Sequence, residues 1–139
     1  MDETATTVST AAANVIEFET GMFGFPNARR FILGEVPGGG EIFKQLLAVE
    51  QPDLGFTLVM PNAFFPDYLP PISEEDLTAL EAGNVEDVVI MVIANVPREV
   101  KESTANLRAP LMFNPYTRKA RQVILSDERY TTRQRLFQG

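Results

Sequence analysis

Short apolar runs separated by Gly and Pro dominate the first half of the chain. Runs with strand-like character cover residues 15–19, 31–33, 42–49 and 54–60. The first stops at Gly21, and Pro61 closes the last because proline cannot donate a hydrogen bond to a sheet. The cluster at 38–40, three consecutive glycines, is a turn signal between two of the runs. This succession of strands and turns is typical of an antiparallel meander or a barrel.

A longer strand is predicted over residues 85–96. Its apolar stretch from 88 to 94 lacks polar alternation, which indicates a central strand covered on both faces. The β-branched residues in it disfavour a helix. Two more strands are predicted at 107–113 and 121–125, and the turn signal Asn114-Pro115 between them makes them antiparallel neighbours.

One short helix is predicted from Ser73 to about Ala82. Ser73 is placed to cap the first backbone amides, and Asp76 at the third helical position completes a reciprocal capping box. Gly83 is placed to end the helix. The acidic residues at 74–76 suit the positive end of the helix dipole, so the exposed face of this helix is expected to be strongly acidic.

Composition supports one small domain. A chain of 139 residues with ten Phe can fill one hydrophobic core, and ten Pro and nine Gly favour many short elements joined by turns. The predicted fold is therefore mainly β: a small antiparallel β-barrel-like single domain with one or two short helices. Residues 1–13, rich in Thr and Ala, are expected to form a flexible N-terminal tail, and residues 14–139 the domain.

Membrane and secretion signals are absent from the sequence. The apolar run at 88–94 is much shorter than the roughly 20 residues that span a bilayer. The N-terminus lacks the basic and apolar regions of a secretion signal. The sequence therefore predicts a cytoplasmic protein without membrane contact.

Charge is distributed unevenly along the chain. Residues 1–97 carry 15 acidic and 3 basic side chains, whereas residues 98–139 carry 4 acidic and 9 basic ones, within a net charge of −7. The acidic part repels nucleic acid and attracts basic protein surfaces. The basic part lacks the interleaved aromatic residues of a nucleic-acid site, apart from Tyr116 and Tyr130. We therefore expect protein partners and no direct contact with nucleic acid.

The sequence contains few side chains that could act in catalysis. The chain has no Cys and no His, which removes thiolate and imidazole nucleophiles, general bases and metal ligands. The expectation is a protein with no catalytic residue, no metal and no cofactor. One alternative stays open: a small β-barrel enzyme or ligand carrier that uses carboxylates such as Asp53 and Asp67.

Several stretches together resemble one known family. They read IEFETGMFGFP at 16–26, PDLGFTLV at 52–59, NAFFPDY at 62–68 and TANLRAPL at 104–111, followed by NP at 114–115 and QVIL at 122–125. Each alone is weakly specific, but their order and spacing resemble the flagellar assembly factor family FliW over nearly the whole chain.

The resemblance implies a small β-barrel-like fold and a function in partner switching. Proteins similar to this one bind flagellin in the cytoplasm and also bind the RNA-binding translational repressor CsrA. Flagellin that accumulates takes the FliW protein away from CsrA, which then represses flagellin translation. An acidic protein is a suitable ligand for a basic RNA-binding partner.

Candidate partner-binding residues fall in three places, and each has a structural alternative. The loop at 64–68 presents either an anchor for a partner or rings that plug the barrel end. Asn106 is either a contact or a turn residue that satisfies backbone groups. The acidic helix is either a solvated face or a surface that attracts CsrA. The candidates are Phe64, Phe65, Asp67, Tyr68, Asn106, Glu74, Glu75 and Asp76.

Overall fold

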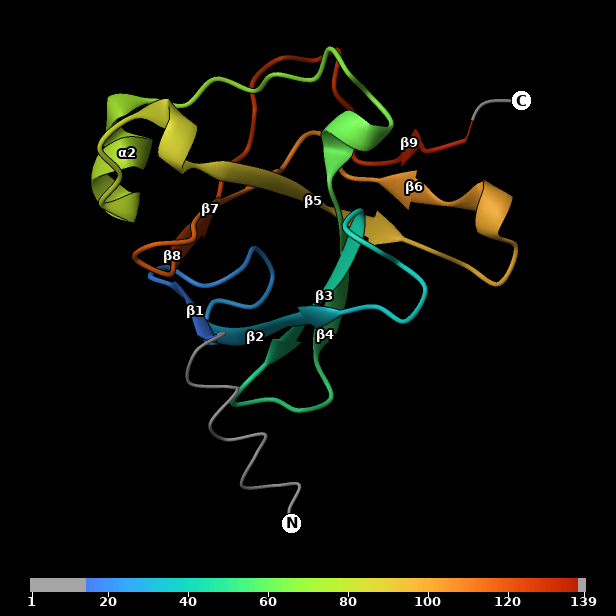
Figure 1. The fold of residues 1–139 in the computed structure, drawn as a ribbon, viewed down its shortest axis with the longest axis horizontal. Helices are drawn as coiled ribbons and strands as arrows, with labels where there is room; N and C mark the ends of the chain where they lie inside the picture. Colours follow the sequence, from blue (N-terminus) through green and yellow to red (C-terminus); the bar gives the residue numbers. More distant parts are fainter. Residues whose placement is uncertain (1–14, 138–139) are drawn as a thin grey trace.

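The computed structural model describes residues 15–137 (Figure 1). The expected tail at 1–13 lies outside these residues. The described residues form strands β1 (Val15–Phe18), β2 (Arg30–Glu35), β3 (Phe43–Ala48), β4 (Gly55–Val59), β5 (Val89–Asn95), β6 (Thr104–Ala105), β7 (Leu111–Asn114), β8 (Lys119–Gln122) and β9 (Gln134–Arg135), helix α2 (Glu74–Leu80), and 3₁₀ turns η1 (Pro61–Ala63), η2 (Val85–Asp87) and η3 (Val100–Glu102).

Seven of these strands close into a barrel. The sheet order is β4-β3-β2-β1-β8-β7-β5, and a further pairing of β4 with β5 joins its two ends. β1 and β8 run parallel, with Glu17 opposite Lys119, and the other pairs are antiparallel. β6 and β9 continue the sheet beyond β5. The prediction of a mainly β, barrel-like fold is confirmed. No helix in the described part of the chain is long and apolar enough to cross a membrane.

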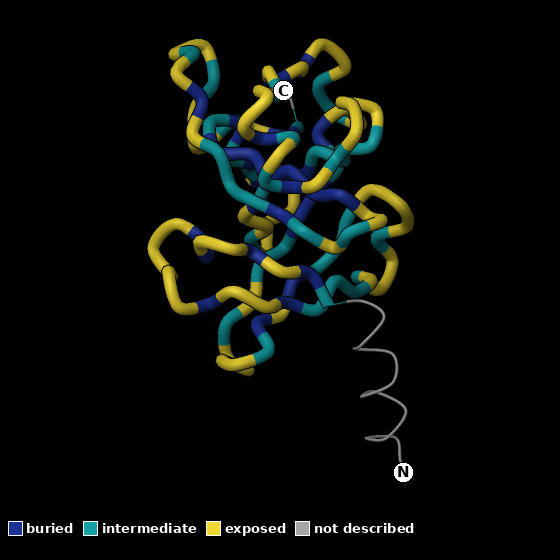
Figure 2. The backbone as a smooth tube through the Cα atoms, turned by 90° about the vertical axis from the view of Figure 1, so that its left-hand side faces the viewer, coloured by how far each residue is buried: buried dark blue, intermediate teal, exposed yellow. Residues whose placement is uncertain are grey.

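The barrel interior is filled by alternate residues of its strands. In β2, Phe31 faces inward and is fully buried, and its ring meets that of Phe18 edge to face with centroids 5.3 Å apart. Alternation follows from the strand geometry, because successive side chains point to opposite faces. Figure 2 shows the buried backbone inside the molecule and the exposed backbone in its loops. The buried interior residues are Ile16, Phe18, Met22, Ala28, Phe31, Leu46, Ala48, Leu58, Met91, Leu111, Phe113 and Ala120.

β5 is covered on both faces, as its unbroken apolar sequence predicts. Met91 packs into the barrel, while Val92 and Ala94 face outward into a second apolar cluster. That cluster is built from the loop after β4, the segment around Leu107 and the C-terminal segment with Leu136. Residues 85–87, predicted as part of the strand, instead form the 3₁₀ turn η2.

The predicted strand at 107–113 is wrong over its first four residues. In β5, Ala94 lies opposite Ala105 of β6, and Met91 lies opposite Leu111 of β7. The two pairs are three residues apart in β5 but six residues apart on the segment that pairs with it. Three extra residues therefore bulge out between β6 and β7. Asn106 explains the bulge, because its side-chain oxygen accepts the backbone N–H of Arg108 (3.1 Å) and of Ala109 (3.0 Å) in place of sheet partners.

The capping box that begins α2 is confirmed, but the predicted end of the helix is wrong. The hydroxyl of Ser73 accepts the Asp76 N–H at 3.0 Å, and the Asp76 carboxylate accepts the Ser73 N–H at 2.9 Å. The helix stops at Leu80, and Glu81 rather than Gly83 takes the left-handed conformation (φ 54°). The backbone N–H groups of Glu81 and Ala82 donate to carbonyls of the last turn, and the side chains of Asn114 and Thr117 donate to the Leu80 carbonyl, so the helix ends here and not at Gly83.

Replacing Ser73 with alanine should lower the free energy of unfolding by about 1 kcal/mol, because the Asp76 N–H loses its acceptor. Urea denaturation of both proteins measures the change. Ser126→Ala is the matched control, since Ser126 is exposed and lies outside the helix. Equal stability of the two variants would show that the cap contributes nothing.

Candidate functional site

An aromatic cluster covers the outer face of β4 and β5. The loop at 64–68 follows η1 directly, and Asn62 closes it by donating its side-chain amide to the Tyr68 carbonyl at 2.9 Å. The Phe64 ring lies 6.1 Å from that of Phe43 and 5.5 Å from that of Phe137, both in edge-to-face geometry. The loop is therefore attached to the barrel on one side and to the C-terminal segment on the other.

Tyr68 ties three separate segments together. Its side chain is buried, and its hydroxyl donates to the Leu107 carbonyl at 2.7 Å. Its ring meets Tyr130 edge to face at 5.0 Å, and the Leu107 N–H donates to the Thr131 carbonyl at 3.0 Å. Burial, with a smaller contribution from Tyr130, raises the pKa of the Tyr68 phenol above its ordinary value. Tyr68 is thus a core residue, but it covers the outside of the barrel rather than plugging its end.

A shallow pocket of about 350 Å³ opens beside this cluster. Its floor is aromatic and apolar, and its polar side chains are Asp67, Arg129 and Gln134. Arg129 is already engaged: its guanidinium donates to Asp127 at 2.7 Å and lies over the Tyr130 ring. These hydrogen bonds hold the pKa of the Asp127 carboxyl down at about 2. An apolar floor with a charged rim suits a side chain of a protein partner. The lining residues are Phe65, Asp67, Tyr68, Leu107, Arg129, Tyr130 and Gln134.

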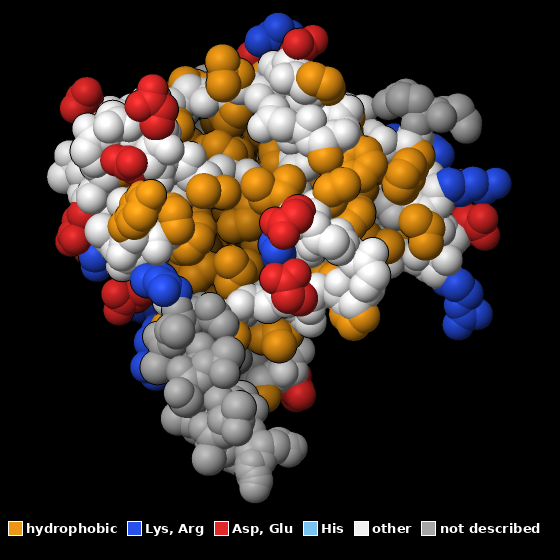
Figure 3. Space-filling model, viewed as in Figure 1, with side chains coloured by type: hydrophobic (Ala, Val, Ile, Leu, Met, Phe, Trp, Pro, Cys, Tyr) orange, Lys and Arg blue, Asp and Glu red, His pale blue; other side chains and the backbone are white. Residues whose placement is uncertain are grey.

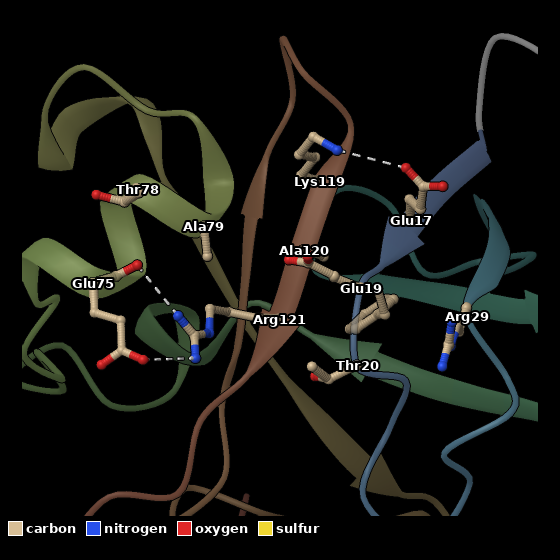
Figure 4. Close-up of a pocket in the computed structure, with 11 residues that line it drawn as sticks. Glu17, Glu19, Thr20, Arg29, Glu75, Thr78, Ala79, Lys119, Ala120 and Arg121 are labelled. Atoms are coloured by element: carbon tan, nitrogen blue, oxygen red, sulfur yellow. Dashed lines mark hydrogen bonds and ion pairs between the residues drawn. The ribbon is translucent and has the colours of Figure 1, made fainter.

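A larger groove, of about 850 Å³, lies between α2, β8 and the end of β1 (Figure 4). On its floor, Arg121 points toward α2 and Lys119 points toward Glu17, whose carboxylate is 3.6 Å away. Arg121 donates to the Glu75 carbonyl at 3.3 Å and forms an ion pair with Asp76 at 3.3 Å. Lys119 and Arg121 are thus each paired with an acidic residue, Glu17 of β1 and Asp76 of α2, and Arg29 also lines the groove.

The three candidate residues on α2 differ in their exposure to solvent and in their hydrogen bonding. Glu74 and Glu75 are exposed, whereas Asp76 is only 6% exposed and is committed to the capping box and to Arg121. An acidic outer face is therefore present, but Asp76 belongs to the helix structure. Its side chain is not free to meet a partner while the helix stays capped.

The structure brings some candidates together and separates others. Phe65, Asp67 and Tyr68 line the same pocket, and Asn106 precedes its lining residue Leu107. Asn106 itself uses its side-chain oxygen for the bulge. The acidic helix lines the other cavity. Sequence reasoning missed the contribution of the C-terminal segment, which supplies Arg129, Tyr130 and Gln134; the aromatic ring within a basic run was the available signal.

The carboxylate alternative gains no geometric support. Asp67 is the only carboxylate that lines its pocket, and Asp53 lines neither of the two cavities. Among residues 15–137, no group of three Asp, Glu, His or Cys side chains is arranged to hold a metal ion. The aromatic pocket and the acidic helix are therefore better candidates for the functional site than a site built on Asp53 and Asp67.

Comparison with known proteins gives a consistent result. The family model described as FliW protein matches residues 1–136. The flagellar assembly factor FliW of Symbiobacterium thermophilum is 55% identical over 126 residues, which cover 91% of each chain. That of Natranaerobius thermophilus is 38% identical and covers 88% of this chain and 82% of its own length.

A solved structure supports the same relationship. The crystal structure of the flagellar assembly factor FliW superimposes with a TM-score of 0.84 at 34% sequence identity, and the match covers 91% of this chain and 87% of that one. All of these relatives are named as assembly factors rather than as enzymes. With the family model spanning nearly the full sequence and the barrel shared, this chain belongs to the FliW family of flagellar assembly factors.

Proposed function

We propose that this protein is a non-enzymatic regulatory protein of the cytoplasm that binds flagellin and antagonises the translational repressor CsrA. The observation that supports the proposal most strongly is the 55% identity to a named flagellar assembly factor over 91% of the chain. Flagellin that accumulates before export competes for the protein and releases CsrA, which represses flagellin translation. Export of flagellin reverses the exchange, so synthesis follows assembly.

Such a switch requires only noncovalent binding, and no covalent reaction takes place in it. When two partners compete for one pool of protein, the fraction in each complex follows their concentrations and dissociation constants. Each tenfold preference for one partner corresponds to about 1.4 kcal/mol of binding free energy. A modest change in free flagellin is then enough to redistribute the protein between its complexes.

The surface supplies two features that suit protein partners. The aromatic pocket holds Phe65 and Tyr68 in a fixed arrangement, which lowers the entropy lost on binding. The exposed Glu74 and Glu75 of α2 add negative charge, which attracts a basic RNA-binding protein. Together they support contact with protein partners.

The test is a competition between purified proteins. Flagellin and CsrA from the same organism are each expected to co-elute with this protein in size-exclusion chromatography. Flagellin added to the CsrA complex is expected to displace CsrA in proportion to its concentration. Failure of either partner to bind, or a stable complex of all three proteins without displacement, would refute the switch.

A further inference from the structure

One apolar side chain projects into solvent beside the aromatic pocket. Leu69 has an exposed fraction of 85%, the highest among the large hydrophobic residues of the described chain that face solvent. Tyr68, directly before it, is buried and lines the pocket, and Pro70, directly after it, is also buried. The Leu69 side chain therefore forms an apolar projection next to the pocket.

The backbone around Leu69 is held by specific contacts. The Tyr68 hydroxyl donates to the Leu107 carbonyl at 2.7 Å, and the Tyr68 carbonyl accepts the side-chain amide of Asn62 at 2.9 Å. The rings of the two prolines that follow Leu69 fix two further backbone angles. A side chain presented by so restricted a segment loses little conformational entropy when another surface covers it. Leu69 is thus suited to act as an anchor.

The pocket beside Leu69 has the complementary shape. Its volume of about 350 Å³ lies at the low end of the range of roughly 300 to 1,000 Å³ found for small-molecule pockets, which is ample for one leucine side chain. Tyr68, Leu107 and Tyr130 give it an apolar floor. An apolar projection and an apolar pocket therefore occur on one patch of surface, formed by the loop at 65–69 and the segment at 129–134.

The rim of the pocket carries charges of both signs. Asp67 forms no ion pair with another of the described residues. Arg129 uses its Nε and one Nη atom for Asp127, yet 80% of its side chain is exposed, so it keeps N–H donors for a second carboxylate. Figure 3 shows acidic and basic side chains next to each other at the upper edge of the molecule, where Figure 1 draws the loop after η1 and the segment before β9. A partner with charge of only one sign would meet a like-charged group on this rim.

We propose that a second copy of this chain docks on this patch about a two-fold axis. In a two-fold contact both copies present the same surface, so every feature needs its complement within that surface. Leu69 of each copy enters the pocket of the other, and Asp67 of each copy faces Arg129 of the other. With only one anchor on each side, the interface belongs to the small and transient class, so the dimer forms reversibly at high protein concentration.

The dimer covers the aromatic pocket in both copies. A copy in the dimer therefore does not offer that pocket to another protein, and the fraction of open pockets falls as the protein concentration rises. This inference does not depend on the proposed function, because its test contains only this chain.

Sedimentation equilibrium of the full chain, from about 10 μM to about 1 mM, measures the self-association. The average mass of the parent protein is expected to rise from 15.4 kDa toward twice that value. Leu69→Ser is expected to weaken dimerisation about tenfold or more, because each copy loses its anchor. Tyr116→Ser is the matched control and should dimerise like the parent protein, since Tyr116 is similarly exposed (81%) but lies in the β7–β8 turn, outside the pocket lining. A parent protein that stays monomeric throughout this range, one that grows past the dimer, or an equal loss in both variants would overturn the inference.

Charge reversal tests the two-fold arrangement itself. Asp67→Arg and Arg129→Asp each place like charges opposite each other in a dimer of one variant, so each variant alone is expected to dimerise more weakly than the parent protein. In an equimolar mixture the two variants present opposite charges at both contacts, so dimerisation is expected to return. Undiminished dimerisation of Asp67→Arg, or a mixture that fails to dimerise, would contradict the proposed contact. Melting temperatures show that each variant is folded; if Arg129→Asp unfolds, Leu69→Ser and Asp67→Arg still decide the question, since both positions are exposed.

Discussion

Replacing Tyr68 with alanine is expected to lower the free energy of unfolding by about 3 to 5 kcal/mol, the range seen when a buried aromatic ring is removed. The variant loses the ring contact with Tyr130 and leaves a cavity between β5 and the C-terminal segment. It also leaves the Leu107 carbonyl without the hydroxyl that donates to it. Urea denaturation monitored by circular dichroism measures the loss.

Two further variants separate the causes of this loss. Tyr68→Phe keeps the ring and removes only the hydroxyl, so a cost of about 1 to 3 kcal/mol is expected from the unpaired carbonyl. Tyr116→Ala removes a tyrosine that is 81% exposed and should change stability by no more than about 0.5 kcal/mol. If Tyr68→Ala were as stable as Tyr116→Ala, Tyr68 would be a surface residue and the arrangement described for the loop would be wrong.

Replacing Asn114 with alanine is the second change with a large expected effect, about 2 to 4 kcal/mol, because it removes all the hydrogen bonds that one buried side chain makes to the end of α2 and to the β7–β8 turn. Asn114 is 2% exposed, and its side-chain amide donates to the carbonyls of Leu80 (3.0 Å) and Glu81 (3.3 Å). Its side-chain oxygen accepts the Tyr116 N–H at 2.9 Å. One side chain thus holds the end of α2 and shapes the β7–β8 turn.

Hydrogen exchange tests where the Asn114 effect falls. Amides of α2 are expected to exchange faster in Asn114→Ala than in the parent protein, and by a larger factor than amides of β2 and β3, which lie away from the helix. Asn27→Ala, at an exposed position, is the control and should leave both sets unchanged. Uniform acceleration across α2 and the barrel strands would show that Asn114 supports the whole fold instead of the helix end.

The two effects bear on function in different ways. Tyr68 holds the loop that carries Phe65 and Asp67, so its loss should disturb the pocket that these residues line even where the barrel still folds. Asn114 holds α2 against β8, where Glu75 and Arg121 face each other across the groove. Partner binding measured on Tyr68→Phe, the milder of the two Tyr68 variants, therefore reports on loop position while the ring stays in the core.

The sequence predicted correctly those features that depend on interactions between residues close together in the chain. Ser73 and Asp76 are three residues apart, and their reciprocal hydrogen bonds depend only on the backbone between them. The strand β5 was recognisable because a run of β-branched residues without polar alternation suits a strand covered on both faces. The barrel class followed from the same short-range signals, and the quoted motifs led to the family.

Contacts between distant parts of the chain determined how the barrel closes and which residues of the aromatic loop are buried. The pairing of β4 with β5 and the parallel pairing of β1 with β8 close the barrel, and no local pattern specifies either. Tyr68 is buried because Leu107 and Tyr130, 39 and 62 residues further along the chain, come to meet it. Its neighbour Leu69 is 85% exposed for the same reason. Which of two adjacent apolar residues faces water depends on the surface that folds against them, and only the assembled tertiary structure supplies that surface.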